Sequence, residues 1–93
     1  MFIGLLIVDL LIKDAMNIKD RRNVLASIIQ KLRSNFNVSV ADVSKELLYN
    51  KATLAITTIA NKKNVVENFL DKISNFISKN YSIEILNIER QIL

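Results

Sequence analysis

Positive charge is concentrated in one short segment of this chain, and this segment is the strongest candidate for a binding site. Between Asn17 and Ser34 there are five basic residues and a single acid, Asp20, while the rest of the chain carries equal numbers of bases and acids. The whole surplus of +4 therefore lies in one segment. Surplus charge confined to one element favours an anionic partner. The five basic residues are Lys19, Arg21, Arg22, Lys31 and Arg33.

Residue types that are absent exclude much of the usual chemistry of active sites. The chain has no cysteine and no histidine, which excludes disulfides, thiolate or imidazole metal sites and the commonest general base. Asp9, Asp14 and Asp42 match the spacing of no cation-binding loop, so we expect no metal site. No nucleotide-binding motif is present, and we expect no cofactor.

Hydrophobic periodicity predicts the elements that position the basic segment. A continuous apolar run indicates a strand buried on both faces, alternation indicates half-buried strands, and apolar residues three and four apart indicate helices. In chain order we expect a strand from Phe2 to Ile12, a helix capped by Asn17, strands from Phe36 to Ala41 and from Ala52 to Ala60, a helix capped by Asn61 or Asn64, and a strand from Ile83 to Ile88.

This β-α-β-β-α-β order is typical of the ferredoxin-like arrangement, an α+β fold with two helices on one face of a four-stranded antiparallel sheet. We expect a single domain over residues 1–93, with the first and third strands in the centre. The run from Phe2 to Ile12 is too short to cross a bilayer as a helix, and Asp9 interrupts it. It also lacks the basic start and cleavage site of a signal peptide. A cytoplasmic protein that does not contact membranes is therefore expected.

The sheet face away from the helices is expected to be apolar. Even positions of the first strand carry no charge and should face the helices, which leaves the odd positions on the open face together with Asp9. Such a row of aliphatic residues favours homo-oligomerisation, because symmetric self-association is the commonest way to bury an apolar patch. The alternative is that small residues on the neighbouring strands break up the patch enough for a monomer. The residues of the row are Ile3, Leu5, Ile7 and Leu11.

Arg21 has an ambiguous position on the basic helix. It lies about 40° from Leu25 in the apolar stripe, whereas Arg22 lies about 60° away on the other side. A phosphate at the helix start would suit both arginines, because free backbone N–H groups and guanidinium groups bind the same anion. For the remaining bases, the alternative is that they only solvate the helix. For Arg21 the alternative is an internal ion pair with Asp9, Asp14 or Asp20.

Four segments of the chain resemble the YlxP-like family of small bacterial proteins. They are N-I-K-D-R-R (17–22), F-N-V-S-V-A-D-V (36–43), A-T-L-A-I (52–56) and I-L-N-I-E-R-Q-I-L (85–93). The family's S-L-K-D-K-R pattern falls on residues 17–22. The resemblance implies a ferredoxin-like fold and, because the family is often labelled ribosome-binding-factor-like, a role around the small ribosomal subunit or its RNA. The family often has polar residues where this chain has Ile7 and Leu11, a departure that favours self-association over RNA binding on the sheet face.

Other classes with this topology match the sequence less well. RNA-recognition motifs stack bases on aromatic residues of the central strands, and Ala52 to Ala60 contains none. Acylphosphatases are similar in size and use a loop arginine with an asparagine, for which Arg21 and Asn61 are candidates. Their phosphate loop is rich in glycine, however, and Gly4 is the only glycine here. Small-molecule regulatory modules also bind through glycine-containing loops, so no small-molecule substrate is expected.

The sequence therefore predicts a non-enzymatic accessory protein of translation or small-subunit maturation that contacts RNA phosphates through its first helix. The alternative is a homo-oligomeric interaction module with an acidic protein partner. An acylphosphatase-like enzyme is the less favoured reading.

Overall fold

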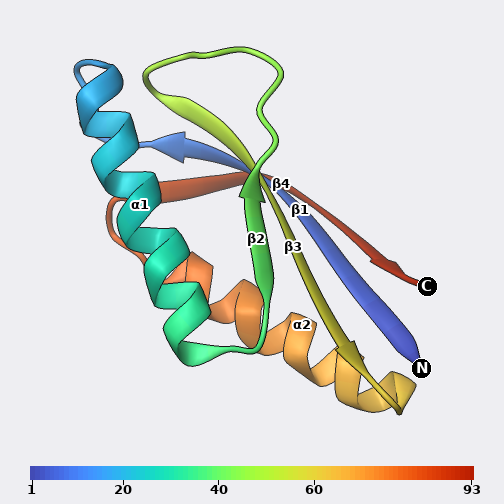
Figure 1. Cartoon of the computed structure of the whole chain (residues 1–93). Helices are drawn as coiled ribbons and strands as arrows, with labels where there is room; N and C mark the ends of the chain where they lie inside the picture. Colours follow the sequence, from blue (N-terminus) through green and yellow to red (C-terminus); the bar gives the residue numbers. More distant parts are fainter.

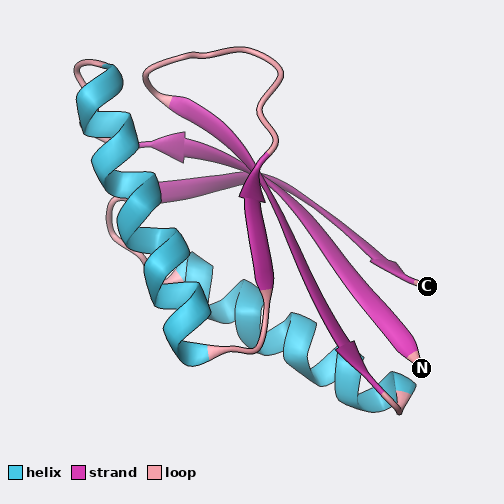
Figure 2. Ribbon diagram, viewed as in Figure 1, coloured by secondary structure: helices cyan, strands magenta, loops and turns pink.

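Six elements follow one another in the computed structural model, which describes residues 1–93 (Figure 1). The predicted element order is confirmed. The four strands form one antiparallel sheet in the order β2-β3-β1-β4, so β1 and β3 are central, and both helices cover one face (Figure 2). This is the ferredoxin-like α+β fold. The elements are β1 (Phe2–Ile12), α1 (Ile18–Asn35), β2 (Ser39–Asp42), β3 (Lys51–Ala60), α2 (Lys63–Ser78) and β4 (Ile83–Ile92).

One apolar core of sixteen buried residues lies between the sheet and the helices. The even positions of β1 from Leu6 to Ile12 belong to it, because alternate residues of a strand face the same side. The helices contribute Leu25, Ile28 and Leu32 from α1 and Val66, Leu70, Ile73 and Ile77 from α2. Neither helix combines the length and the apolar composition needed to cross a bilayer.

Two strand boundaries differ by more than one residue from those predicted. The alternating stretch that begins at Phe36 becomes a strand only at Ser39, because Phe36 ends α1 and its ring packs edge-to-face on Phe76, with the ring centroids 5.5 Å apart. The last strand continues beyond Ile88 to Ile92, since its backbone still pairs with β1. Apolar patterning located the strands but not their ends, because ladder hydrogen bonds do not require apolar side chains.

The start of α2 lacks the cap that the sequence suggested. Neither Asn61 nor Asn64 caps this helix, so that expectation is wrong. Lys62 holds the N-cap position in extended conformation, and its side chain makes no capping hydrogen bond because an ammonium group cannot accept one. The first turn also contains no acidic residue. The free N–H groups and the positive end of the helix dipole are therefore uncompensated.

Replacing Lys62 with aspartate is expected to stabilise the protein by about 1 kcal/mol, because the new carboxylate accepts from the free N–H groups and complements the dipole. For a domain of this size the melting temperature should rise by about 4–8 °C. Calorimetry of Lys62→Asp measures the change, and Lys62→Ala is the matched control that removes the charge without adding a cap. An equal gain in both variants would contradict the missing cap as the cause.

The sheet face away from the helices carries the predicted apolar row. Ile3, Leu5, Ile7 and Leu11 are all half-buried there, between the side chains of the neighbouring strands. The molecule is elongated, measuring 42 × 23 × 18 Å, and the helices cover one face of its sheet and leave the other open (Figure 2). The predicted assignment of the two faces is confirmed.

Candidate nucleic-acid interface

The basic helix begins at a well-formed cap. As predicted, Asn17 is the N-cap residue, and its side chain accepts a hydrogen bond of 2.9 Å from the backbone N–H of Asp20. The Asp20 carboxylate in turn accepts from the backbone N–H of Met16 at 2.9 Å. This reciprocal pair satisfies two backbone donors and fixes the first turn of α1. The only acid of the basic segment is thus occupied at the helix start.

Arg21 is an internal residue, only 6% exposed. Its Nε donates to the backbone carbonyl of Lys51 at 3.1 Å, and its Nη2 donates to the Asp42 carboxylate at 3.0 Å and to the Ser44 hydroxyl at 3.1 Å. The predicted orientation toward the core side is confirmed. The partner, however, is Asp42 and none of the three aspartates proposed from the sequence. These contacts engage Nε and Nη2 of the guanidinium, which favours the internal ion pair over phosphate binding at Arg21.

Ser44 completes a network that ties α1 to the loop between β2 and β3. Its backbone N–H and its hydroxyl both donate to Oδ1 of Asp42, and the hydroxyl accepts from the backbone N–H of Thr53 at 2.9 Å. Burial by itself would raise the pKa of Asp42. The hydrogen bonds from Ser44, and then the hydrogen bond and charge of Arg21, outweigh burial and hold this pKa below its ordinary value. Asp42 is therefore ionised and paired at neutral pH.

Three of the other basic residues share one side of α1. Arg33 follows Arg22 by eleven residues, which returns the helix to within about 20° of the same direction, and Lys19 lies one turn before Arg22. All three are exposed. Lys19 and Arg22 form no hydrogen bond or ion pair, and Arg33 donates to the carbonyl of Val40 at 3.3 Å. We refer to Lys19, Arg22 and Arg33 as the basic row.

Lys31 does not belong to the basic row. It follows Arg22 by nine residues, or about two and a half turns, and so projects from the opposite side of α1. It is exposed and forms no ion pair. Of the five basic residues predicted to act together, the structure brings three together, buries one and turns one away.

An open groove lies beside the basic row, between α1 and β2. Its volume is about 560 Å³. β2 is an edge strand, so the backbone groups along its outer side pair with no other strand. Arg33 reaches across from α1 to Val40 on β2 at this groove. Its lining residues are Ala26, Ile29, Gln30, Arg33, Ser34, Val40, Ala41 and Asp42.

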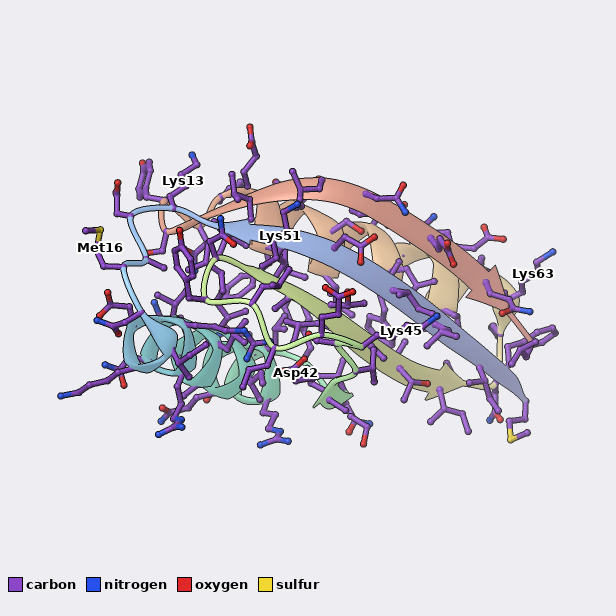
Figure 3. All side chains as sticks on the ribbon, turned by 90° about the horizontal axis from the view of Figure 1, so that it is seen from above. Lys13, Met16, Asp42, Lys45, Lys51 and Lys63 are labelled. Atoms are coloured by element: carbon purple, nitrogen blue, oxygen red, sulfur yellow. The ribbon has the colours of Figure 1, made fainter.

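A larger hollow of about 770 Å³ lies on the open sheet face, beside the loop formed by residues 43–50. Asp9 lines this hollow, and its Oδ1 accepts a hydrogen bond of 2.7 Å from Oγ1 of Thr53. Asp42, Lys45 and Lys51 mark the course of the loop from the end of β2 to the start of β3 (Figure 3). No sequence pattern predicts this hollow, because residues 43–50 follow neither helix nor strand periodicity.

No three acidic residues come together where they could hold a metal ion, and this includes Asp9, Asp14 and Asp42.

The topology and the single core define a small ferredoxin-like domain of the α+β class. A family model described as "Protein of unknown function (DUF503)" matches residues 3–90, and the chain belongs to this family. It is similar to "Uncharacterized protein YlxP" of Bacillus subtilis (strain 168), with 26% identity over 82 residues that cover 88% of this chain and 89% of that protein. The resemblance to the YlxP-like family is thereby confirmed.

Among solved structures, the chain is similar to "De novo designed protein Foldit4". The TM-score is 0.54 at 14% sequence identity, and the match covers 100% of this chain and 97% of that protein. At this identity the likeness concerns the fold alone.

Proposed function

We propose that this protein is a non-enzymatic accessory factor of translation or small-subunit ribosome maturation in the bacterial cytoplasm. Its partner is the small ribosomal subunit or its RNA, whose phosphates it contacts through the basic row. The observation that supports this proposal is that Lys19, Arg22 and Arg33 project from one side of α1 and pair with no carboxylate. The ribosome is proposed as the partner because the chain resembles the YlxP-like family.

The length and surroundings of the basic row suit a polyanionic chain. Lys19 and Arg33 are fourteen residues apart, which spans about 21 Å along the helix and so several successive phosphates. The groove beside the row gives an extended strand a place between α1 and β2. Asp42, the acid in that groove, is neutralised by Arg21 and does not oppose an incoming phosphate.

Contacts from the row would be to phosphates, not to bases. The open sheet face, where RNA-recognition motifs stack bases, carries aliphatic and small side chains on β1 and β3. Binding through a row of cations positions an RNA without reading its sequence. We therefore expect affinity that depends strongly on salt and weakly on base sequence.

Replacing the whole basic row by alanine is expected to weaken binding to purified small ribosomal subunits by at least about tenfold at moderate salt. Each lost phosphate contact removes about 0.7–0.9 from the slope of log K against log salt, so the slope should fall by about 2–3. Co-sedimentation with small subunits over a series of salt concentrations measures both quantities. Circular dichroism confirms that the variant is folded.

The matched control removes three exposed lysines elsewhere, Lys62, Lys63 and Lys72, and so changes the net charge equally. Lys63 lies at the far end of the molecule from Met16, which marks the start of α1 (Figure 3). This control should bind like the unchanged protein. Equal weakening of both triple variants, or of neither, would contradict the proposal. Binding to an acidic protein in place of small subunits and RNA would favour the alternative partner.

A further inference from the structure

The monomer leaves more surface in water than its size requires. A folded protein of this mass exposes about 5,500 Å², whereas this chain exposes 5976 Å². The radius of gyration is 13.1 Å, against about 12.3 Å for a domain of this length. Both differences agree with a sheet that is covered by helices on one face only. The uncovered face is therefore the natural place for a partner surface.

Side-chain size varies regularly across this open face. β1 carries the bulky row Ile3, Leu5, Ile7 and Leu11, whereas the positions paired with it on β3 become small toward the middle of the strand. Ile7 is opposite Ala55 and Leu5 is opposite Thr57 in the register of the sheet. Ala41 and Ser39 of β2 continue the small half. The face thus has a bulky half and a small half that meet midway between β1 and β3, which is also the middle of the sheet.

We propose that a second copy of this chain covers the open face and forms a two-fold symmetric dimer. The two-fold axis runs parallel to the strands, between β1 and β3, so that the middle of the bulky row of each copy packs on the small residues in the middle of the other copy's β3. Ile7 then lies on the partner's Ala55, and Leu5 lies on the partner's Thr57. Large side chains opposite small ones interdigitate in the way that well-packed sheet interfaces do.

Charges on the open face fit the same symmetry. The half formed by β1 and β4 is acidic, and the half formed by β2, β3 and their loop carries the bases. Because the axis places each half over the other, acids of one copy lie near bases of its partner. It also places Asp9 over the partner's Thr53, a hydroxyl residue, and not over a second Asp9. The charged residues are Asp9, Glu84 and Glu89 on the acidic half, and Lys45, Glu46 and Lys51 on the other.

The area of the face is sufficient for a dimer. Three strands of ten or eleven residues and the four-residue β2, spaced about 4.8 Å apart, give a footprint of about 550 Å² per copy. Two copies together then cover about 1,100 Å², which is above the area of about 1,000 Å² expected of a biological interface. The bulky half and the small half belong to the same face of one chain. Two copies of the chain therefore complement each other without a different partner molecule.

Sedimentation of the purified chain from low to several hundred micromolar tests the dimer. The unchanged protein should dimerise within this range. Ile7→Glu should raise the dimer dissociation constant by at least about 30-fold, because it places a charge at the centre of the interface. Ala55→Arg should raise the dissociation constant similarly, because it places a large side chain where the partner's Ile7 would pack. This substitution removes no large side chain that packs in the monomer. Tyr81→Glu, at a residue 95% exposed and away from the face, is the control and should dimerise like the unchanged protein.

Charge reversal tests the arrangement of the two copies. Lys51→Glu and Glu84→Lys should each weaken the dimer, because residue 84 lies only one strand to the side of the partner's residue 51 in this arrangement. The double variant should recover most of the loss, since opposite charges are then near each other again. A monomer across the whole concentration range would overturn the proposal. So would a dimer that persists in both Ile7→Glu and Ala55→Arg, an assembly larger than two, or a double variant weaker than either single one. Binding to RNA plays no part in these measurements, so their outcome is independent of the proposed function.

Discussion

Replacing Arg21 with methionine is expected to lower the free energy of unfolding by about 2–3 kcal/mol. The apolar part of the side chain is kept, but the Lys51 carbonyl, the Asp42 carboxylate and the Ser44 hydroxyl lose their shared donor. Breaking a fully buried pair costs about 3–5 kcal/mol. The smaller figure applies because the Asp42 side chain is 33% exposed, so water replaces part of the lost interaction. The melting temperature should fall by about 8–24 °C, measured by calorimetry.

The chain provides a matched control in its second ion pair. Arg90 donates to Asp71 at 2.6 Å, closer than Arg21 approaches Asp42, but the two side chains are 37% and 61% exposed. Exposed pairs contribute about 0–1 kcal/mol, so Arg90→Met should change stability little. Chemical denaturation of both variants compares them directly. Similar losses in the two variants would mean that burial does not determine the importance of Arg21.

The same network predicts that the free energy of unfolding depends on pH in acid. Because the pKa of Asp42 is lowered in the folded state, its contribution to stability is fully present above the ordinary carboxyl pKa of about 4. That contribution is lost as the pH falls through the folded-state value. The difference in unfolding free energy between the unchanged protein and Arg21→Met should therefore narrow in acid below about pH 4. A difference that stays constant down to pH 2 would exclude Asp42 as the partner that matters.

The partner of Arg21 shows where sequence patterns stop being informative. Helical periodicity places Arg21 on the core side of α1, and the structure confirms it. Periodicity says nothing about Asp42, which lies 21 residues away and reaches Arg21 only because β2 packs beside α1. The aspartates considered from the sequence were close to the helix start, whereas tertiary contacts select partners by position in space. Element order and core faces were predictable because they depend on local apolar period alone.

In the candidate interface, too, local spacing predicts some features whereas tertiary contacts determine the others. The separation of Lys31 from the basic row follows from helix geometry and was available from the spacing of the residues. The groove beside the basic row could not be predicted from this spacing, because the groove depends on where the short edge strand β2 begins. Phe36 fits an alternating pattern equally well as strand or as the end of a helix, and its contact with Phe76 decides between them.

Replacing Gly4 with alanine is expected to destabilise the protein by about 1–3 kcal/mol. A Cβ atom at this position would lie 2.5 Å from Cγ1 of Val66 and 3.1 Å from both terminal methyl groups of Leu70. Val66 and Leu70 are fully buried on α2, and a valine side chain is stiff about its first torsion, so the helix itself must move. Alanine in a strand is otherwise favoured over glycine by about 0.5–1 kcal/mol. A loss of stability would therefore measure how closely α2 approaches β1.

A double variant tests whether that contact is the cause. Val66→Ala alone should cost about 1–3 kcal/mol, because it leaves a cavity above Gly4. When Gly4→Ala is added, the new methyl group occupies part of that cavity and the clash with Cγ1 is absent. The double variant should therefore be more stable than the sum of the single effects by about 1–2 kcal/mol, measured by chemical denaturation of all four proteins. Additive effects would show that β1 accommodates the methyl group without α2, and the only glycine of the chain would then have no role in helix packing.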